Sequence, residues 1–102
     1  MKILTLIVYA DVKQLLADTL HSLKQVSGFT FTDVEGHGAK DGRDPTLSAH
    51  DDVVGYVPHV RVDILLENKD VADVLDALRN SRCGLAGRGR YWITEVESQG
   101  QL

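Results

Sequence analysis

The sequence has very little cysteine and no long hydrophobic run. The single cysteine, Cys83, excludes a disulfide scaffold and a cysteine-based zinc cage, and it favours a reducing compartment. No apolar stretch reaches the roughly 18 residues that a membrane-spanning helix needs, and no small-residue cleavage site follows the apolar residues 3–9. We therefore expect a cytoplasmic protein without membrane insertion, built as one domain over residues 1–102.

Positive charge is also scarce, with 11 Lys and Arg against 15 Asp and Glu and a net charge of −4. This balance excludes a general nucleic-acid binder. The charge is nevertheless uneven, because residues 77–94 contain four arginines and no acidic residue. A local cationic segment on an acidic chain predicts one discrete anion site.

Motifs for catalysis are missing as well. The sequence contains no Ser-His-Asp order, no paired catalytic carboxylates and no nucleophile elbow. Its glycine-rich segment matches neither a Walker loop nor a dinucleotide fingerprint. We therefore expect a protein that is not an enzyme, and a small phosphate-cleaving enzyme stays open only if turnover is observed.

The hydrophobic pattern predicts four strands and two helices. The predicted strands are residues 2–9, 29–35, 60–66 and 91–96. Asp11, with Gln14 three residues later, predicts the start of a helix that ends near residues 24–26. Asn68 or Asp70 predicts the start of the second helix, which Gly84 would end. This order is typical of a ferredoxin-like α+β fold, βαββαβ, with a four-stranded antiparallel sheet and two helices on one face.

Two parts of the chain show no periodicity. Residues 37–58 form a loop that is long for a compact domain, which indicates function or mobility, and residues 97–102 form a polar tail that frays. The first strand is apolar on both faces, so we expect the open face of the sheet to be apolar and to be covered in an oligomer. Tyr91 and Trp92 are expected to pack in the core or against another subunit.

The glycine-rich segment carries the clearest chemical signal. Gly84, Gly87 and Gly89 allow close backbone approach and inward-pointing amides, as in phosphate-binding nests, and Arg88 and Arg90 add guanidinium donors. The alternative is a simple helix-to-strand connection with solvated arginines. The arginines around Cys83 could also lower the pKa of its thiol, although most single cysteines only fill space.

Three histidines lie in or beside the long loop, together with several aspartates. His37, His50 and His59 do not follow a known ligand spacing, but a folded loop could bring them together. Imidazole with carboxylate suits zinc, nickel or copper. The alternative is a polar loop in which histidines occur by chance.

Three short motifs, in order and at matching separations, resemble the PII-like signalling proteins. Residues 29–38, Phe-Thr-Phe-Thr-Asp-Val-Glu-Gly-His-Gly, are similar to that family's second strand and its entry to the T-loop. Residues 57–63, Val-Pro-His-Val-Arg-Val-Asp, are similar to the exit from the T-loop. Residues 83–90, Cys-Gly-Leu-Ala-Gly-Arg-Gly-Arg, are similar to the B-loop. The resemblance covers roughly residues 1–96.

The resemblance implies a homotrimer that binds an adenine nucleotide (ATP, ADP, AMP or cyclic AMP) in clefts between subunits. It implies a non-enzymatic regulator whose loop, residues 37–58, contacts a target protein such as a membrane transporter or an efflux system. The residues that it places at the nucleotide are Gly84, Gly87, Arg88, Gly89 and Arg90 near the phosphates, and Thr30, Gly36, Gly38, Asp63 and Ile64 near the nucleoside.

The chain also departs from the family pattern. Ala39-Lys40 stands where the classical members have Arg-Gln, and His59 stands where they have lysine, so 2-oxoglutarate sensing is not expected. The two C-terminal arginines that reach the phosphates are lacking, which favours weaker triphosphate binding. Some short PII-like proteins are associated with heavy-metal efflux, and this supports a second hypothesis, a metal-responsive protein with His37, His50 and His59 as ligands of a divalent ion.

Overall fold

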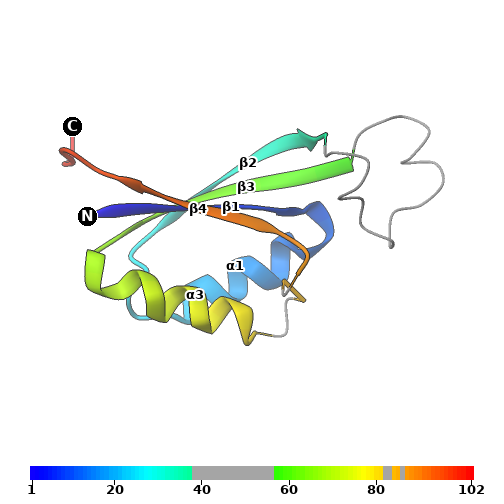
Figure 1. Cartoon of the computed structure of the whole chain (residues 1–102), viewed down its shortest axis with the longest axis horizontal. Helices are drawn as coiled ribbons and strands as arrows, with labels where there is room; N and C mark the ends of the chain where they lie inside the picture. Colours follow the sequence, from blue (N-terminus) through cyan, green and yellow to red (C-terminus); the bar gives the residue numbers. More distant parts are fainter. Residues whose placement is uncertain (38–56, 82–83, 86) are drawn as a thin grey trace.

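The computed structural model describes residues 1–37, 57–81, 84–85 and 87–102. In chain order the elements are β1 (Lys2–Tyr9), a 3-10 turn (Ala10–Val12), α1 (Lys13–Ser22), β2 (Phe29–Gly36), β3 (Val57–Leu66), a 3-10 turn (Asn68–Asp70), α3 (Val71–Arg79) and β4 (Arg90–Glu95). The four strands form one antiparallel sheet in the order β2-β3-β1-β4. Figure 1 shows both helices on the same side of this sheet. The predicted ferredoxin-like α+β fold is confirmed.

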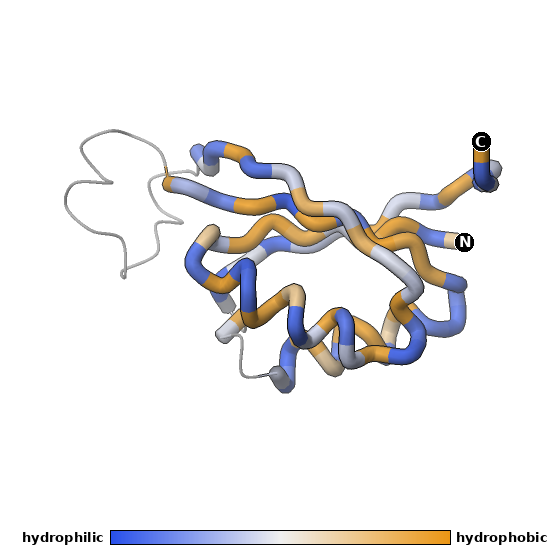
Figure 2. Tube along the Cα trace, turned by 180° about the vertical axis from the view of Figure 1, so that it is seen from behind, coloured by the Kyte–Doolittle hydropathy of each residue, from blue (hydrophilic) through white to orange (hydrophobic). Residues whose placement is uncertain are grey.

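The core lies between the sheet and the two helices. Strands β1 and β3 alternate along their length, and every second side chain faces the helices and is buried. Figure 2 shows hydrophobic residues recurring along the central strands and the helices that face them. The buried apolar side chains are Leu4, Leu6, Val8, Val12, Leu16, Leu20, Val60, Val62, Ile64, Leu66, Val71, Val74, Leu75 and Leu78. Because both central strands contribute full rows, this layer fixes the register of the sheet.

The first helix begins and ends differently from the prediction. Asp11 is not its N-cap, because residues 10–12 form a 3-10 turn and α1 begins at Lys13. No described side chain caps this start, and Gln14 instead donates a hydrogen bond of 3.0 Å to Asp18. The helix ends at Ser22, where Leu23 turns to an extended conformation, so the predicted end at residues 24–26 is too late.

The second helix, α3, begins at Val71 after a 3-10 turn at Asn68–Asp70, so Asp70 stands at the predicted N-cap position, but its side chain makes no capping hydrogen bond. The helix does not reach Gly84. It ends at Arg79, and the Ser81 hydroxyl donates a hydrogen bond of 2.7 Å to the Leu78 carbonyl oxygen, which satisfies an acceptor at the helix end. Among the helices that the structure describes, neither is long and apolar enough to cross a membrane.

The third strand is longer than predicted. Val57 and Pro58 pair with Gly36 and Glu35, so they belong to β3 and not to the loop. The rest of the predicted loop, residues 38–56, lies outside the described residues. β4 runs one residue earlier than predicted, from Arg90 to Glu95. At the other end of the sheet the chain just after β4 meets the start of β1, since the Val96 N–H donates a hydrogen bond of 3.2 Å to the Met1 carbonyl oxygen.

Candidate functional site

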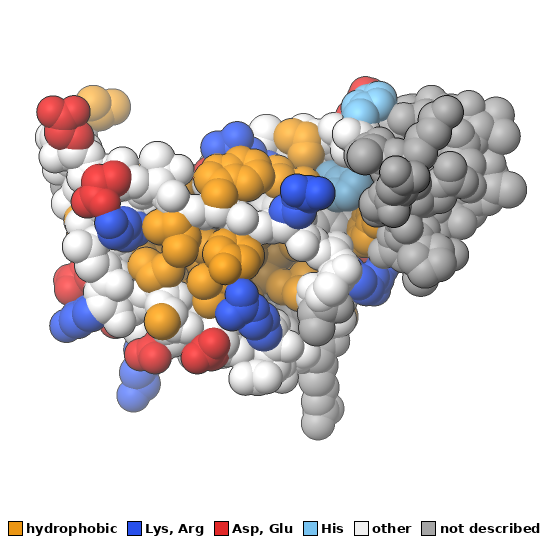
Figure 3. All heavy atoms as spheres, in the orientation of Figure 1, with side chains coloured by type: hydrophobic (Ala, Val, Ile, Leu, Met, Phe, Trp, Pro, Cys, Tyr) orange, Lys and Arg blue, Asp and Glu red, His pale blue; other side chains and the backbone are white. Residues whose placement is uncertain are grey.

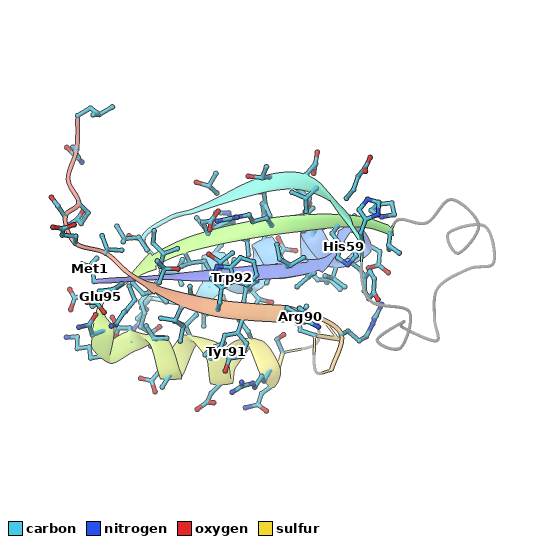
Figure 4. The ribbon with its side chains drawn as sticks, turned by 45° about the horizontal axis from the view of Figure 1, so that its top comes forward. Met1, His59, Arg90, Tyr91, Trp92 and Glu95 are labelled. Carbon is cyan, nitrogen blue, oxygen red and sulfur yellow. The ribbon has the colours of Figure 1, made fainter. Side chains whose placement is uncertain are left out.

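One end of each of the four strands lies at the same end of the sheet. β1 and β2 finish there, at Tyr9 and Gly36, and β3 and β4 begin there, at Val57 and Arg90. Figure 4 shows His59 and Arg90 at this end of the sheet, with Met1 and Glu95 at the opposite end. We call it the loop end of the sheet. The antiparallel topology therefore brings the glycine-rich segment and the start of β3 to one place.

The glycine-rich segment needs its glycines for two different reasons. Gly84 and Gly87 both have φ of +73°, a left-handed conformation that side chains rarely adopt. The Arg88 N–H donates a hydrogen bond of 3.0 Å to the Leu85 carbonyl oxygen, which closes a turn through Gly87. Gly89 lies against β1, where an added Cβ would stand 3.0 Å from the Val8 side chain. The segment is thus a tight connection fitted to the end of β1.

The two arginines of this segment differ in their surroundings. The Arg88 guanidinium lies over the Tyr9 ring, 5.3 Å from its centroid, and approaches the Asp11 carboxylate at 3.9 Å. Arg90 begins β4, is exposed, and makes no ion pair with any residue in the described part of the chain. An anion arriving at the loop end would therefore meet one arginine already in contact with its own chain and one that is available.

An aromatic pair joins this segment to the ends of β2 and β3. Tyr9 and His59 are cross-strand neighbours, with ring centroids 4.7 Å apart. The His59 Nδ1 lies 2.8 Å from the Val57 carbonyl oxygen, to which it donates. The same ring lies on the backbone of Gly36, where an added Cβ would stand 2.1 Å from Nδ1. Sequence reasoning missed Tyr9 entirely, and only the strand register could have found it.

Of the residues expected at the nucleoside, Gly36 lies at the loop end, whereas Thr30, Asp63 and Ile64 lie further along the sheet. Thr30 pairs with Asp63 in the body of the sheet, six positions along β2 from Gly36, which is about 20 Å of strand. Ile64 is fully buried in the core, so its side chain is not available to a ligand and only its main chain keeps the prediction open. Gly38 lies outside the described residues. One subunit therefore presents the candidate nucleotide residues as two separated groups.

Asp63 is held within a polar network on the open face of the sheet. It accepts a hydrogen bond of 2.7 Å from the Thr5 hydroxyl and one of 3.0 Å from Arg61. Burial alone would raise the pKa of Asp63, but these hydrogen bonds and the guanidinium charge together hold that pKa below its ordinary value. Arg61 in turn lies over the Trp92 ring, 5.7 Å from its centroid. Asp63 is thus an ionised carboxylate that already has two partners.

The open face is less apolar than the sequence predicts. The hydrophobic side chains on this face around the polar network include Ile3, Ile7, Leu65 and Trp92. The face is less apolar than expected because Arg61 and Asp63 alternate out of the core on the same side as these residues. Trp92 is 42% exposed, so it does not pack in the core of its own subunit. Figure 3 shows the hydrophobic side chains that reach the surface along β4. Tyr91 and Ile93 are exposed there too, but on the helix-facing side of the strand, since they pair with the buried Leu6 and Leu4.

The metal hypothesis finds no support in the described residues. His37 pairs with Glu35 at 3.3 Å, and His59 is held between Tyr9 and Gly36. Across residues 1–37, 57–81, 84–85 and 87–102, no three His, Cys, Asp or Glu side chains gather as a metal site would require. His50 and Cys83 lie outside the described residues.

Comparison with known proteins defines the class of this chain. The nitrogen regulatory protein P-II of Rhizobium meliloti (strain 1021) is 28% identical over 85 residues, which are 80% of this chain and 76% of that protein. The nitrogen regulatory protein GlnK of Escherichia coli (strain K12) is 24% identical over 98 residues, which are 95% of this chain and 87% of that protein. The chain is therefore a divergent PII-like protein.

The particular family is narrower. A family model described as a protein of unknown function, DUF3240, matches residues 1–102, and the chain belongs to this family. The crystal structure of a DUF3240 family protein from Shewanella baltica OS155 superposes with a TM-score of 0.77 at 26% identity, covering 99% of this chain and 94% of that one. The likeness therefore covers nearly the whole length of both chains.

Proposed function

We propose that this chain is a non-catalytic regulatory protein that binds a phosphate-bearing effector, most readily an adenine nucleotide, at the loop end of its sheet. The observation that carries the proposal is Arg90, an exposed guanidinium without an ion-pair partner among the described residues, beside a connection made of left-handed glycines. Guanidinium groups bind phosphate oxygens with charge-assisted hydrogen bonds. The regulatory role is supported by the P-II names of the relatives.

The proposal includes an assembly of three subunits with ligand clefts between them. Two observations support an assembly. The open face carries half-buried apolar side chains that a second copy would cover. The two groups of candidate nucleotide residues are about 20 Å apart on one subunit, so a single nucleotide would take them from two subunits. Light scattering after size-exclusion chromatography measures the mass, and a monomer at micromolar concentration would refute this part.

The ligand site is tested by calorimetry on the purified full chain with ATP, ADP, AMP and cyclic AMP. We expect Arg90→Ala to weaken the binding of the best of these by at least about tenfold, because one charge-assisted hydrogen bond contributes about 1.5–3 kcal/mol. Arg79→Ala is the matched control, since Arg79 belongs to the same cationic segment but contacts Tyr91 and Asp76 instead. Equal affinity in the Arg90→Ala variant and the wild type would show that the site lies elsewhere.

The effector would act by selecting one conformation of the protein that a target recognises. A ligand shifts such an equilibrium only by its difference in affinity for the two states. For such a shift, some contacts within the protein have to differ between the free state and the state with an anion bound at the glycine-rich segment. The target would be a protein that reads this change next to the ends of β2 and β3.

A further inference from the structure

The glycine-rich segment is linked to the ends of β2 and β3 by a continuous series of side-chain contacts. Arg88 lies over Tyr9, and Tyr9 packs on His59. His59 rests on Gly36 and is hydrogen-bonded to Val57. We infer that Tyr9 and His59 are positioning residues that couple Arg88 to Gly36 and Val57, and this series of five residues is called the relay below. The inference rests on the proposed function in that the bound anion would act on Arg88.

The proposal requires two arrangements at the Arg88 end of the relay, one without a ligand and one with a bound anion. Without a ligand the guanidinium rests on the Tyr9 ring face and lies 3.9 Å from the Asp11 carboxylate. The Asp11 side chain is 71% exposed, so this ion pair is weak and a phosphate oxygen would compete with it readily. When the guanidinium turns to a phosphate, its contact with the ring is lost or rearranged. The contact is therefore a difference between two states, which coupling requires.

At the other end of the relay, the His59 ring is closely packed and hydrogen-bonded. The His59 ring touches the Gly36 backbone so closely that an added Cβ would stand 2.1–2.2 Å from two of its atoms. Its Nδ1 is tied to the Val57 carbonyl oxygen at 2.8 Å. Gly36 and Val57 are themselves paired across β2 and β3. Any displacement of the imidazole thus acts on both strands where the sheet ends.

A simple packing role would make different predictions. If the two rings only fill space, removing Arg88 changes global stability but has no particular effect on the ends of β2 and β3. If the relay couples them, the effect of Arg88 on those strand ends depends on an aromatic ring at position 9. The distinguishing observable is therefore the dependence of one substitution on another, a double-mutant cycle.

The first experiment needs no ligand. Hydrogen exchange is measured for backbone amides of residues 34–37 and 57–60 in the full-length chain. We expect Arg88→Ala to accelerate exchange there by about fivefold, within the range expected for the loss of one cation–π contact. Arg79→Ala removes a similar contact, with Tyr91 at 5.4 Å, and should leave these amides unchanged. His21→Ala is the second control, because His21 packs on Phe29 away from the relay.

The cycle is then completed at Tyr9. In a Tyr9→Leu background, Arg88→Ala should no longer change the exchange of these amides, whereas in a Tyr9→Phe background it should still accelerate them about fivefold, because the ring is kept. Exchange of the Leu4 and Leu6 amides in β1 verifies that Tyr9→Leu remains folded. If Tyr9→Leu is not folded, His59→Ala takes its place in the cycle. An equal effect of Arg88→Ala in all backgrounds overturns the relay.

The second experiment uses ADP as the probe. In the wild type, ADP should change the exchange of residues 34–37 and 57–60 by at least threefold, and in Tyr9→Leu it should bind without that change. ADP that binds the wild type and leaves these amides unchanged overturns the relay. If ADP and the other nucleotides fail to bind while the ligand-free cycle succeeds, the relay stands and the proposed effector is wrong. The two failures are thus distinguishable.

Discussion

Gly36 and His59 offer the sharpest test of the loop-end geometry. The structure predicts that Gly36→Ala destabilises the wild type but is neutral or stabilising once His59 is replaced by alanine. An alanine at position 36 would place its Cβ 2.1 Å from Nδ1, 2.2 Å from Cε1 and 2.9 Å from Cγ of His59. Since the ring overlaps at three atoms, a small adjustment is not enough and the imidazole has to leave its position. Gly36 itself does not require glycine for its backbone, because it lies in an extended strand.

The cost follows from what the displaced ring loses. Its stack on Tyr9 is worth about 0.5–1.5 kcal/mol, and its hydrogen bond to the Val57 carbonyl oxygen about 1 kcal/mol. Gly36→Ala should therefore lower the free energy of unfolding by about 1.5–2.5 kcal/mol. For a domain of this size, that lowers the melting temperature by roughly 6–20 °C.

In a His59→Ala background the same substitution should be neutral or stabilising. The ring is already gone, and replacing glycine by alanine in an extended strand restricts the unfolded chain, which is worth about 0.4–1 kcal/mol. Urea unfolding at one fixed protomer concentration measures all four corners of the cycle, since assembly makes stability depend on concentration. Gly28→Ala is the matched control, because an added Cβ there would meet no described atom within 4 Å. Equal penalties in both backgrounds would refute the reasoning.

Two further predictions concern the glycine-rich segment and the open face. Gly87→Ala should lower the free energy of unfolding by about 1–2 kcal/mol in urea titrations. The cause is backbone strain at φ of +73°, since an added Cβ would meet no described atom within 4 Å. An unchanged unfolding midpoint would contradict the left-handed turn. For Asp63, whose folded pKa lies below its ordinary value of 3.8, the stabilisation is complete above about pH 4 and is lost as the pH falls through the lowered pKa. The Asp63→Asn variant should therefore be less stable than the wild type at pH 7, and its stability should fall less on acidification. Parallel curves of melting temperature against pH for the two proteins would contradict this.

The sequence pattern was sufficient to predict the fold because the apolar periodicity is strong in the strands and helices that form the core. The alternation of β3 placed its strand in the sheet, and the spacing of Val71, Val74, Leu75 and Leu78 placed α3 against the core. The errors occurred at element ends. Asp11 failed as a cap because three residues before α1 adopt a 3-10 turn, and propensity rules do not distinguish such a turn from the first turn of a helix.

The candidate site was predictable only in part, for a physical reason. Glycines with arginines between them indicate close backbone approach and positive charge from residue types alone, and Gly84 and Gly87 do adopt the left-handed conformation. The partners of those residues depend on strand register, which local sequence does not contain. Tyr9 meets His59 because β1 and β3 pair at that position, and Arg61 meets Trp92 across β1. Contacts between strands far apart in sequence were therefore missed.

The same geometry explains what the change at position 59 does. The resemblance to PII-like proteins places a lysine there in the classical members, and a lysine carries a mobile point charge that can reach a ligand. In this chain the imidazole packs against Tyr9 with the ring planes tilted by 36°, is hydrogen-bonded to Val57 through Nδ1 and lies on the backbone of Gly36. A side chain fixed at three points cannot swing out to meet an anion. Position 59 is therefore built into the scaffold of the loop end, and the cations that the described residues offer to an anion there are the arginines Arg88 and Arg90.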